Sequence, residues 1–281
     1  MNLIPITSLT DPRLAPYANM RDAELAQRAD PLDAGAHGGL FIAEGDLVVR
    51  RLLHSRFELH SVLTTPTRLD SLRDALEAGA GDAPIFLAQP PLLNDIVGFN
   101  MHRGLLAIGR RGRGLTLNDL LASPGPLVVL EDLTNHDNLG GIFRNAAALG
   151  GTGVGVLLSP RCADPLYRKS LRVSMGCALA VPFARTSEWP DPLSQIAESG
   201  FETWALTPHN DAEPINQIAV PPRVALILGT EGAGLTDTSL SASTRRVRIP
   251  MSKVDESVDS LNVAMAAGIA LSHLAQRTKS K

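Results

Sequence analysis

The sequence predicts an α/β protein with a parallel sheet in its second half and a smaller α/β unit before it. From residue 127 onward, apolar strand-like runs alternate with helical patterns, which is typical of a parallel sheet covered by helices on both faces. A stretch rich in arginine, glycine and proline, residues 111–126, separates this half from residues 1–110. The chain has 281 residues, enough for two domains of ordinary size.

The composition is that of a folded globular protein, with 44% hydrophobic and 20% charged residues. The net charge of -3 means that a nucleic acid must be bound by a local basic patch. The two cysteines, Cys162 and Cys177, form no CxxC pair or cluster with histidine, so we expect buried core cysteines and no metal site. The amino-terminal sequence does not resemble a signal peptide, and the apolar run "VAMAAGIAL" is too short to span a membrane. These features predict a soluble cytoplasmic protein.

The elements of residues 1–110 follow from periodicity and turn residues. A helix is expected from about residue 46, a strand at 59–64, a helix at 69–80, a strand at 84–88, a helix at 90–99 and a strand at 103–111. Residues 111–126 are predicted to be a linker that contains a short helix.

The second half, residues 127–281, contains six predicted strands. They are "LVVLED" (127–132), "VGVLLS" (154–159), "ALAVPFA" (178–184), "ETWALT" (202–207), "VALILG" (224–229) and "RRVRIP" (245–250). In open parallel sheets, ligands bind beyond the carboxyl ends of the strands. Unusual residues that follow three of these strands are therefore candidates for a site.

The first candidate segment is "NHDNLGGIFRNAAALG", residues 135–150, where Asn138 is a suitable helix cap. At helical spacing, one arc is apolar and is expected to face the core: Ile142, Phe143, Ala146, Ala147 and Leu149. Arg144 lies on the opposite side, flanked by Gly140, Gly141 and Ala148. Such a bare face either exposes a solvated arginine or lets another molecule approach it. His136 is a weaker candidate for a base.

The second candidate segment is "LILGTEGAGL", residues 226–235, in which a buried strand runs into Gly229, Gly232 and Gly234. Glycines without a Cβ expose backbone N–H and C=O groups to a ligand. The segment lacks the Gly-Lys-Ser/Thr ending of a nucleotide-binding P-loop and the GxGxxG spacing of a dinucleotide fold. Glu231 is either a surface charge or a polar clamp on the turn.

The third candidate segment covers residues 248–274, where a strand ends at Ile249-Pro250 and Ser260 can cap the last helix. That helix is apolar on nearly every side, so more than one neighbour, including a second subunit, is expected to cover it. Asn262, in its first turn, is the polar exception.

Together the three segments resemble the SpoU/TrmH family of RNA ribose 2′-O-methyltransferases, in the SPOUT superfamily. The first family motif, N-x-G-x-x-x-R, is met by Asn138, Gly140 and Arg144. The second, around G-x-E-G-x-G-L, is met at residues 229–235, and the third, I-P-M followed by S-L-N, at 249–251 and 260–262. The loop between the two halves of the third motif, "SKVDESVD", is longer than the family usually has and lacks its glycines.

The resemblance implies a SPOUT catalytic domain over residues 127–281 with a C-terminal trefoil knot, which periodicity alone does not reveal. It also implies a homodimer and an RNA substrate-binding domain over residues 1–110. S-adenosylmethionine (AdoMet) is the implied cofactor. The residues implied to form the catalytic site are Asn138, Arg144, Glu231, Ser260 and Asn262. Of these, Glu231 is expected to brace the loops or the subunit contact. Those implied to hold the cofactor are Thr207, Gly229, Gly232, Ile249, Met251 and Leu261.

Two readings of function compete with ribose methylation, which is expected on ribosomal RNA more than on transfer RNA. One is methylation of a base nitrogen, and the other is an RNA-binding protein without catalysis. Arg103, Arg110, Arg111 and Arg113 form either a phosphate-binding strip or a solvated linker. Because a guanidinium stays protonated in proteins, Arg144 is expected to act as a positioned cation and not as a base.

Overall fold

The structure is a computed structural model that describes residues 1–18, 21–27, 39–98, 100–101, 104–252, 254–255 and 257–278. Its contacts divide the chain into two compact units. The first combines Met1–Gly114 with Leu166–Ala180, and the second combines Leu115–Pro165 with Val181–Lys281. The predicted division at 110 and 127 follows chain order, whereas the contacts group Leu166–Ala180 with the amino-terminal residues.

The first unit is built on a mixed five-stranded sheet in the order β1-β4-β3-β5-β2. Its strands are β1 (Asn2–Pro5), β2 (Leu40–Glu44), β3 (Leu59–Thr64), β4 (Pro84–Leu87) and β5 (Leu105–Arg110). Its α-helices are α1 (Asp22–Gln27), α2 (Asp46–Leu53), α3 (Pro66–Gly79), α4 (Pro90–Val97) and α7 (Arg168–Val173). The elements predicted between residues 46 and 111 are confirmed, with shifts of a few residues at their ends.

Segment Leu166–Ala180 is held in the first unit by polar contacts from two helices. Arg51 donates to the carbonyl oxygen of Met175 at 2.8 Å and to Cys177 Sγ at 2.7 Å. The backbone N–H of Arg168 donates to the Asp22 carboxylate at 3.3 Å. Residues Cys177–Leu179 form a 3-10 helix, so the strand predicted at 178–184 is shorter and starts at Phe183.

A buried tyrosine links the core of the first unit to its sheet. Tyr17 is fully buried, and its hydroxyl lies 2.7 Å from Ser61 Oγ on β3. Burial raises the pKa of the Tyr17 phenol well above its usual range, so the group stays a neutral hydrogen-bonding partner.

We expect Tyr17→Phe to lower the free energy of unfolding by about 1–2 kcal/mol, because it leaves a buried serine hydroxyl with one partner fewer. Urea denaturation of Tyr17→Phe, Ser61→Ala and the double variant measures this effect as a double-mutant cycle. Strictly additive losses would contradict the account, since the two hydroxyls form one interaction.

The second unit is a seven-stranded sheet in the order β10-β12-β9-β11-β6-β7-β8, and all its strand pairs are parallel. Its strands are β6 (Leu127–Leu130), β7 (Gly155–Leu158), β8 (Phe183–Arg185), β9 (Glu202–Leu206), β10 (Glu213–Pro214), β11 (Val224–Leu228) and β12 (Arg245–Arg248). Its α-helices are α5 (Leu117–Leu121), α6 (His136–Leu149), α8 (Pro192–Glu198), α9 (Asp237–Ala242) and α10 (Val263–Thr278). The predicted parallel α/β sheet is confirmed.

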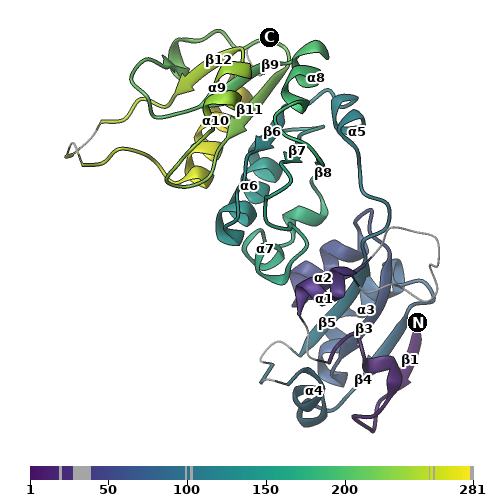
Figure 1. The fold of residues 1–281 in the computed structure, drawn as a ribbon. Helices are drawn as coiled ribbons and strands as arrows, with labels where there is room; N and C mark the ends of the chain where they lie inside the picture. The colour runs from purple at the N-terminus through teal and green to yellow at the C-terminus, as the bar shows by residue number, and fades with distance from the viewer. Residues whose placement is uncertain are drawn as a thin grey trace. The chain divides into compact units, whose positions relative to one another are not determined.

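The neighbouring strands β11, β6 and β7 are buried throughout, as their continuous apolar sequences predict. α10 packs along α6, so the last helix of the chain lies beside the first long helix of this unit (Figure 1). Within the described residues, no helix has the length and apolar character needed to cross a membrane.

Candidate functional site

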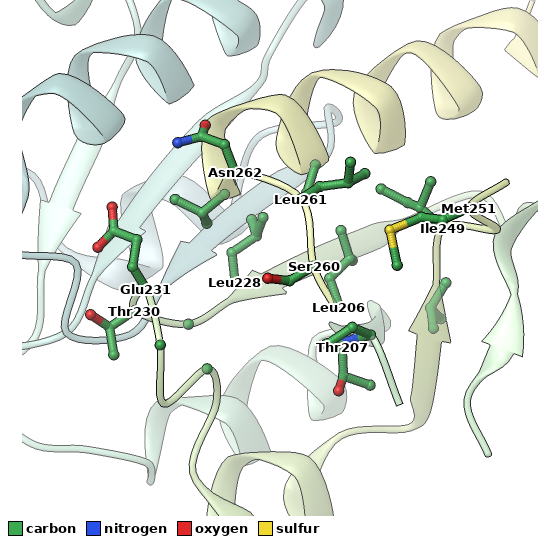
Figure 2. A pocket seen from close by; sticks show the side chains of 17 residues that line it. Leu206, Thr207, Leu228, Thr230, Glu231, Ile249, Met251, Ser260, Leu261 and Asn262 are labelled. Atoms are coloured by element: carbon green, nitrogen blue, oxygen red, sulfur yellow. The ribbon is translucent and has the colours of Figure 1, made fainter. Parts of the chain in front are cut away.

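A cavity of about 310 Å³ lies where the strands β9, β11 and β12 end. Because these strands are parallel neighbours, the segments that follow them meet at one edge of the sheet. Figure 2 shows side chains from all three segments and from the start of α10 around this cavity. The walls are mostly apolar, with contributions from Leu206, Leu228, Val247, Ile249 and Leu261.

Nearly all the predicted site residues line this cavity. All six residues expected to hold the cofactor are in its wall: Thr207, Gly229, Gly232, Ile249, Met251 and Leu261. Three of the five residues expected in the catalytic site also line it: Glu231, Ser260 and Asn262. The structure therefore brings together segments that are up to 55 residues apart in the sequence, from Thr207 to Asn262.

The glycine-rich turn between β11 and α9 closes on itself. The N–H of Gly234 donates to the carbonyl oxygen of Thr230 at 3.0 Å. A Cβ atom on Gly229 would lie 2.2 Å from the carbonyl carbon of Gly234, so this position requires glycine. Gly232 and Gly234 have φ values of 83° and 71°, and no atom lies within 4 Å of where their Cβ atoms would be. The turn thus presents open backbone to the cavity, as its sequence predicts.

Asn138 is not part of the cavity wall, but it forms a hydrogen bond with Asn262, which is. The Asn262 side-chain N–H donates to Asn138 Oδ1 at 2.8 Å, and this bond joins the start of α10 to the start of α6. The prediction that Asn138 caps α6 is wrong. The cap is Asn135, whose Oδ1 accepts the N–H groups of Asp137 and Asn138, because the helix begins one turn earlier than its apolar pattern indicates.

The predicted cap of the last helix is also wrong. Asn262 Oδ1 accepts the N–H groups of Ala264 and Met265, so Asn262 caps α10. The Ser260 hydroxyl donates instead to Asp259 at 2.9 Å. The side-chain oxygen of Asn262 therefore caps α10, while its side-chain nitrogen donates to Asn138 at the start of α6.

Arg144 is exposed on α6 and forms no hydrogen bond or ion pair with any residue that the structure describes. It does not line the cavity of its own chain. Ile142, Phe143 and Ala146 face the core as predicted, but Ala147 is exposed and Leu149 only half-buried. The glycines do not clear space around Arg144, because Gly140 is buried and a Cβ atom on Gly141 would lie 3.0 Å from the Ala264 Cβ of α10.

Glu231 is exposed, and its carboxylate does not clamp the glycine turn within the described part of this chain. The turn is held instead by Glu131, a buried residue directly after β6 that was not among the predicted site residues. The Thr236 hydroxyl donates to Glu131 Oε1 at 2.8 Å, and the Thr236 N–H donates to Oε2 at 3.3 Å. Its position directly after the apolar run "LVVL" could have indicated a role, because charged residues are rarely buried unless they have a partner.

The residues of the 252–259 loop that the structure describes are all exposed. The N–H of Ser257 donates to the Asp255 carboxylate at 2.6 Å, and this backbone hydrogen bond lowers the pKa of Asp255. Lys253 and Glu256 of this loop lie outside the described residues.

The four arginines of the predicted phosphate-binding strip differ in their surroundings. Arg103 lies outside the described residues. Arg110 pairs with Glu58 at 2.9 Å, Arg111 donates to the carbonyl oxygen of Leu40 at 3.3 Å, and Arg113 is exposed.

Comparison with known proteins places the site in a family. The model of the SpoU rRNA methylase family matches residues 125–272, a range that contains all eleven predicted site residues. The chain belongs to the SpoU rRNA methylase family. A relative named as an uncharacterized tRNA/rRNA methyltransferase of Mycobacterium tuberculosis is 44% identical over 264 residues, which cover 92% of this chain and 87% of the relative. A similarly named relative from Synechocystis is 36% identical over 162 residues, 56% of this chain and 57% of that relative.

Solved structures similar to this SpoU family member share its fold over nearly the whole chain. An AdoMet-bound rRNA methyltransferase from Sinorhizobium meliloti matches with a TM-score of 0.75 at 23% identity, over 98% of both chains. A structure described as an RNA 2′-O ribose methyltransferase matches with a TM-score of 0.71 at 25% identity, over 99% of this chain and 100% of that one. The SpoU family member is therefore an RNA methyltransferase whose cofactor is S-adenosylmethionine.

The residues around the cavity fit this cofactor. Apolar side chains from three strands can enclose a flat adenine ring, and the open glycine backbone offers N–H and C=O groups to its polar edge. Among the described residues of the wall, Glu231 is the one with a charged side chain, and it is exposed. Within the described residues, no cluster of histidine, cysteine, aspartate or glutamate could hold a metal ion.

Proposed function

We propose that this protein transfers a methyl group from AdoMet to a ribose 2′-hydroxyl of structured RNA, with ribosomal RNA as the expected class. The observation that carries the proposal is the cavity bounded by the second and third motif segments, with the start of α6, which carries the first motif, joined to its rim by the hydrogen bond between Asn138 and Asn262. A free arginine extends from that same helix. The likeness to an RNA 2′-O ribose methyltransferase structure supports a ribose acceptor.

AdoMet, when bound, supplies a methyl group already activated by a positive sulfonium. The remaining chemical problem is the ribose hydroxyl, a poor nucleophile until its proton leaves. We assign to Arg144 the role of holding the RNA phosphate and stabilising developing negative charge on the hydroxyl oxygen, since its guanidinium stays protonated. Asn138, Ser260 and Asn262 are proposed to complete the polar surface that orients the nucleotide, with Glu231 at its edge.

The residues proposed to hold the cofactor are Thr207, Gly229, Gly232, Ile249, Met251 and Leu261. The adenine is proposed to be held by backbone groups near Gly229, Ile249 and Leu261. The placement of β12 between β10 and β9, with α10 against α6 and β11, agrees with the C-terminal trefoil knot that the family resemblance implies. Residues 1–110 are proposed to bind the RNA substrate, and the protein to act in the cytoplasm.

A homodimer through the catalytic unit is the proposed assembly. The outer face of α10 exposes Met265 by 62% and Ile269 by 41%, and these residues line a groove of about 430 Å³ shared with Asn145 of α6. Exposed apolar residues beside a groove are typical of a subunit contact.

We expect Met265→Arg combined with Ile269→Arg to convert the dimer to a monomer, because two charges would be desolvated in an apolar contact. Sedimentation velocity measures the change. Met175→Arg, which charges an exposed methionine of the first unit, is the matched control. A wild-type protein that sediments as a monomer at all concentrations would contradict the proposed assembly.

Methyl transfer to RNA tests the proposed function. Purified protein is incubated with tritiated AdoMet and separated ribosomal or transfer RNA, and acid-precipitable label is counted. Label in RNA distinguishes an enzyme from a non-catalytic RNA-binding protein, and the fraction that carries it distinguishes ribosomal from transfer RNA. Absence of label from both fractions, with intact binding of RNA, would support the non-catalytic alternative.

A further inference from the structure

We propose that Glu131 is a positioning residue for the cofactor, because it fastens both ends of the glycine-rich turn. The inference rests on the proposed placement of AdoMet in the cavity. Glu131 follows β6 directly and is 1% exposed. It lines neither the cavity nor the surface, so a role in catalysis must pass through the residues that it holds.

The two ends of the turn contact Glu131 through different groups. At the first end, the Glu131 N–H donates to the carbonyl oxygen of Leu228 at 2.9 Å, immediately before Gly229. At the second end, both carboxyl oxygens of Glu131 accept hydrogen bonds from Thr236, immediately after Leu235. The intervening residues 229–235 supply five members of the cavity wall: Gly229, Thr230, Glu231, Gly232 and Gly234.

The chemistry of Glu131 suits a fixed anchor and not a surface charge. Arg161, whose pKa is raised chiefly by Asp132 and also by the charge of Glu131, forms its ion pair with Asp132, so the direct hydrogen bonds to the Glu131 carboxylate come from Thr236. Burying such a group is costly without these hydrogen bonds, and the turn loses its fixed shape if they are lost. Thr236 Oγ1 also lies 3.1 Å from Ser239 Oγ, which accepts the indole N–H of Trp189 at 3.1 Å. Hydrogen-bonding contacts therefore run from Glu131 through Thr236 and Ser239 to Trp189.

A turn that is less firmly held spends less time in the shape that binds AdoMet, and the apparent dissociation constant rises in proportion. We expect Glu131→Gln to raise the Kd for AdoMet, measured by calorimetry without RNA, by about tenfold, the scale of one charge-assisted hydrogen bond. The maximal rate at saturating AdoMet is expected to change less than the KM for AdoMet. RNA affinity measured without AdoMet is expected to stay at the wild-type value.

The variants Thr236→Val and Thr236→Ser test the same contact from its other side. Thr236→Val removes the hydroxyl donor at nearly unchanged volume and is expected to weaken AdoMet binding, whereas Thr236→Ser keeps the donor and is expected to bind as the wild type does. This pair decides the question if Glu131→Gln does not fold. Glu202→Gln is the control. Glu202 lies at the start of β9, away from the turn, and its carboxylate accepts hydrogen bonds from the side chains of Trp204 and Arg245.

Unchanged AdoMet binding in folded Glu131→Gln and Thr236→Val would overturn the inference. If a Gly229→Ala variant loses AdoMet binding while these two keep it, only the role of Glu131 is wrong. If all three variants bind AdoMet as the wild type does, the proposed cofactor placement itself is wrong. Loss of affinity in Glu202→Gln equal to that in Glu131→Gln would also overturn the inference, because general destabilisation would then explain both.

Discussion

Arg144→Ala is expected to lower RNA methylation by a hundredfold or more while AdoMet binding stays unchanged. The size follows from losing a cation that stabilises developing charge at the reacting oxygen. Unchanged AdoMet binding follows from geometry, since Arg144 is exposed on α6 and does not line the cavity of its own chain. Methylation under single-turnover conditions and calorimetry with AdoMet measure the two quantities separately.

Two further substitutions sharpen this test of Arg144. Arg144→Lys keeps the positive charge but loses the planar fork that pairs with phosphate, so an intermediate rate is expected. Arg246→Ala removes another exposed arginine of the same unit, on β12, and is expected to retain the wild-type rate. An Arg144→Ala rate within fivefold of the wild type would show that this arginine is only a solvated surface charge.

Gly229→Ala is expected to raise the Kd for AdoMet by roughly ten- to hundredfold, the range that about 1–3 kcal/mol of overpacking corresponds to. The added Cβ would lie 2.2 Å from the carbonyl carbon of Gly234 and 2.4 Å from the Leu235 nitrogen. Both contacts are with backbone, so the turn must move and its wall of the cavity moves with it. Calorimetry measures the affinity, and circular dichroism checks that the variant is folded.

Gly114→Ala is the matched control for this substitution. No atom lies within 4 Å of a Cβ at Gly114, and its φ is not in the left-handed region, so alanine fits there without strain. If Gly229→Ala binds AdoMet as tightly as Gly114→Ala does, the glycine turn is not part of the cofactor site.

The sequence predicted the buried strands, and the edge of the sheet where the cavity lies, because local pattern and tertiary structure agree there. Continuous apolar runs such as "VALIL" predicted buried parallel strands, and their polar or glycine-rich ends predicted the edge where the cavity lies. The residues expected to hold the cofactor were inferred from a family resemblance. Their meeting in one cavity depends on the strand order, which no local pattern reveals.

The errors arise where several nearby polar residues could cap a helix, or where a neighbour outside the local segment determines the structure. Asn135 and Asn262 replace the predicted caps because each helix starts where a side-chain oxygen can reach two free N–H groups, and several polar residues nearby could have done so. Gly141 is small because α10 packs against it, not because it leaves space beside Arg144. The strand expected at 178–184 loses its first residues to a 3-10 helix whose segment groups with the first unit. Sequence periodicity contains no information on these partners.

Analysis of the methylated RNA tests the central claim most directly. RNA labelled by the protein with tritiated AdoMet is digested by a nuclease whose cleavage requires a free 2′-hydroxyl, and the products are separated by size. We expect label in nuclease-resistant dinucleotides, because a methylated ribose cannot form the cyclic intermediate of cleavage. Label recovered only in mononucleotides would contradict it, since the methyl group would then be on a base.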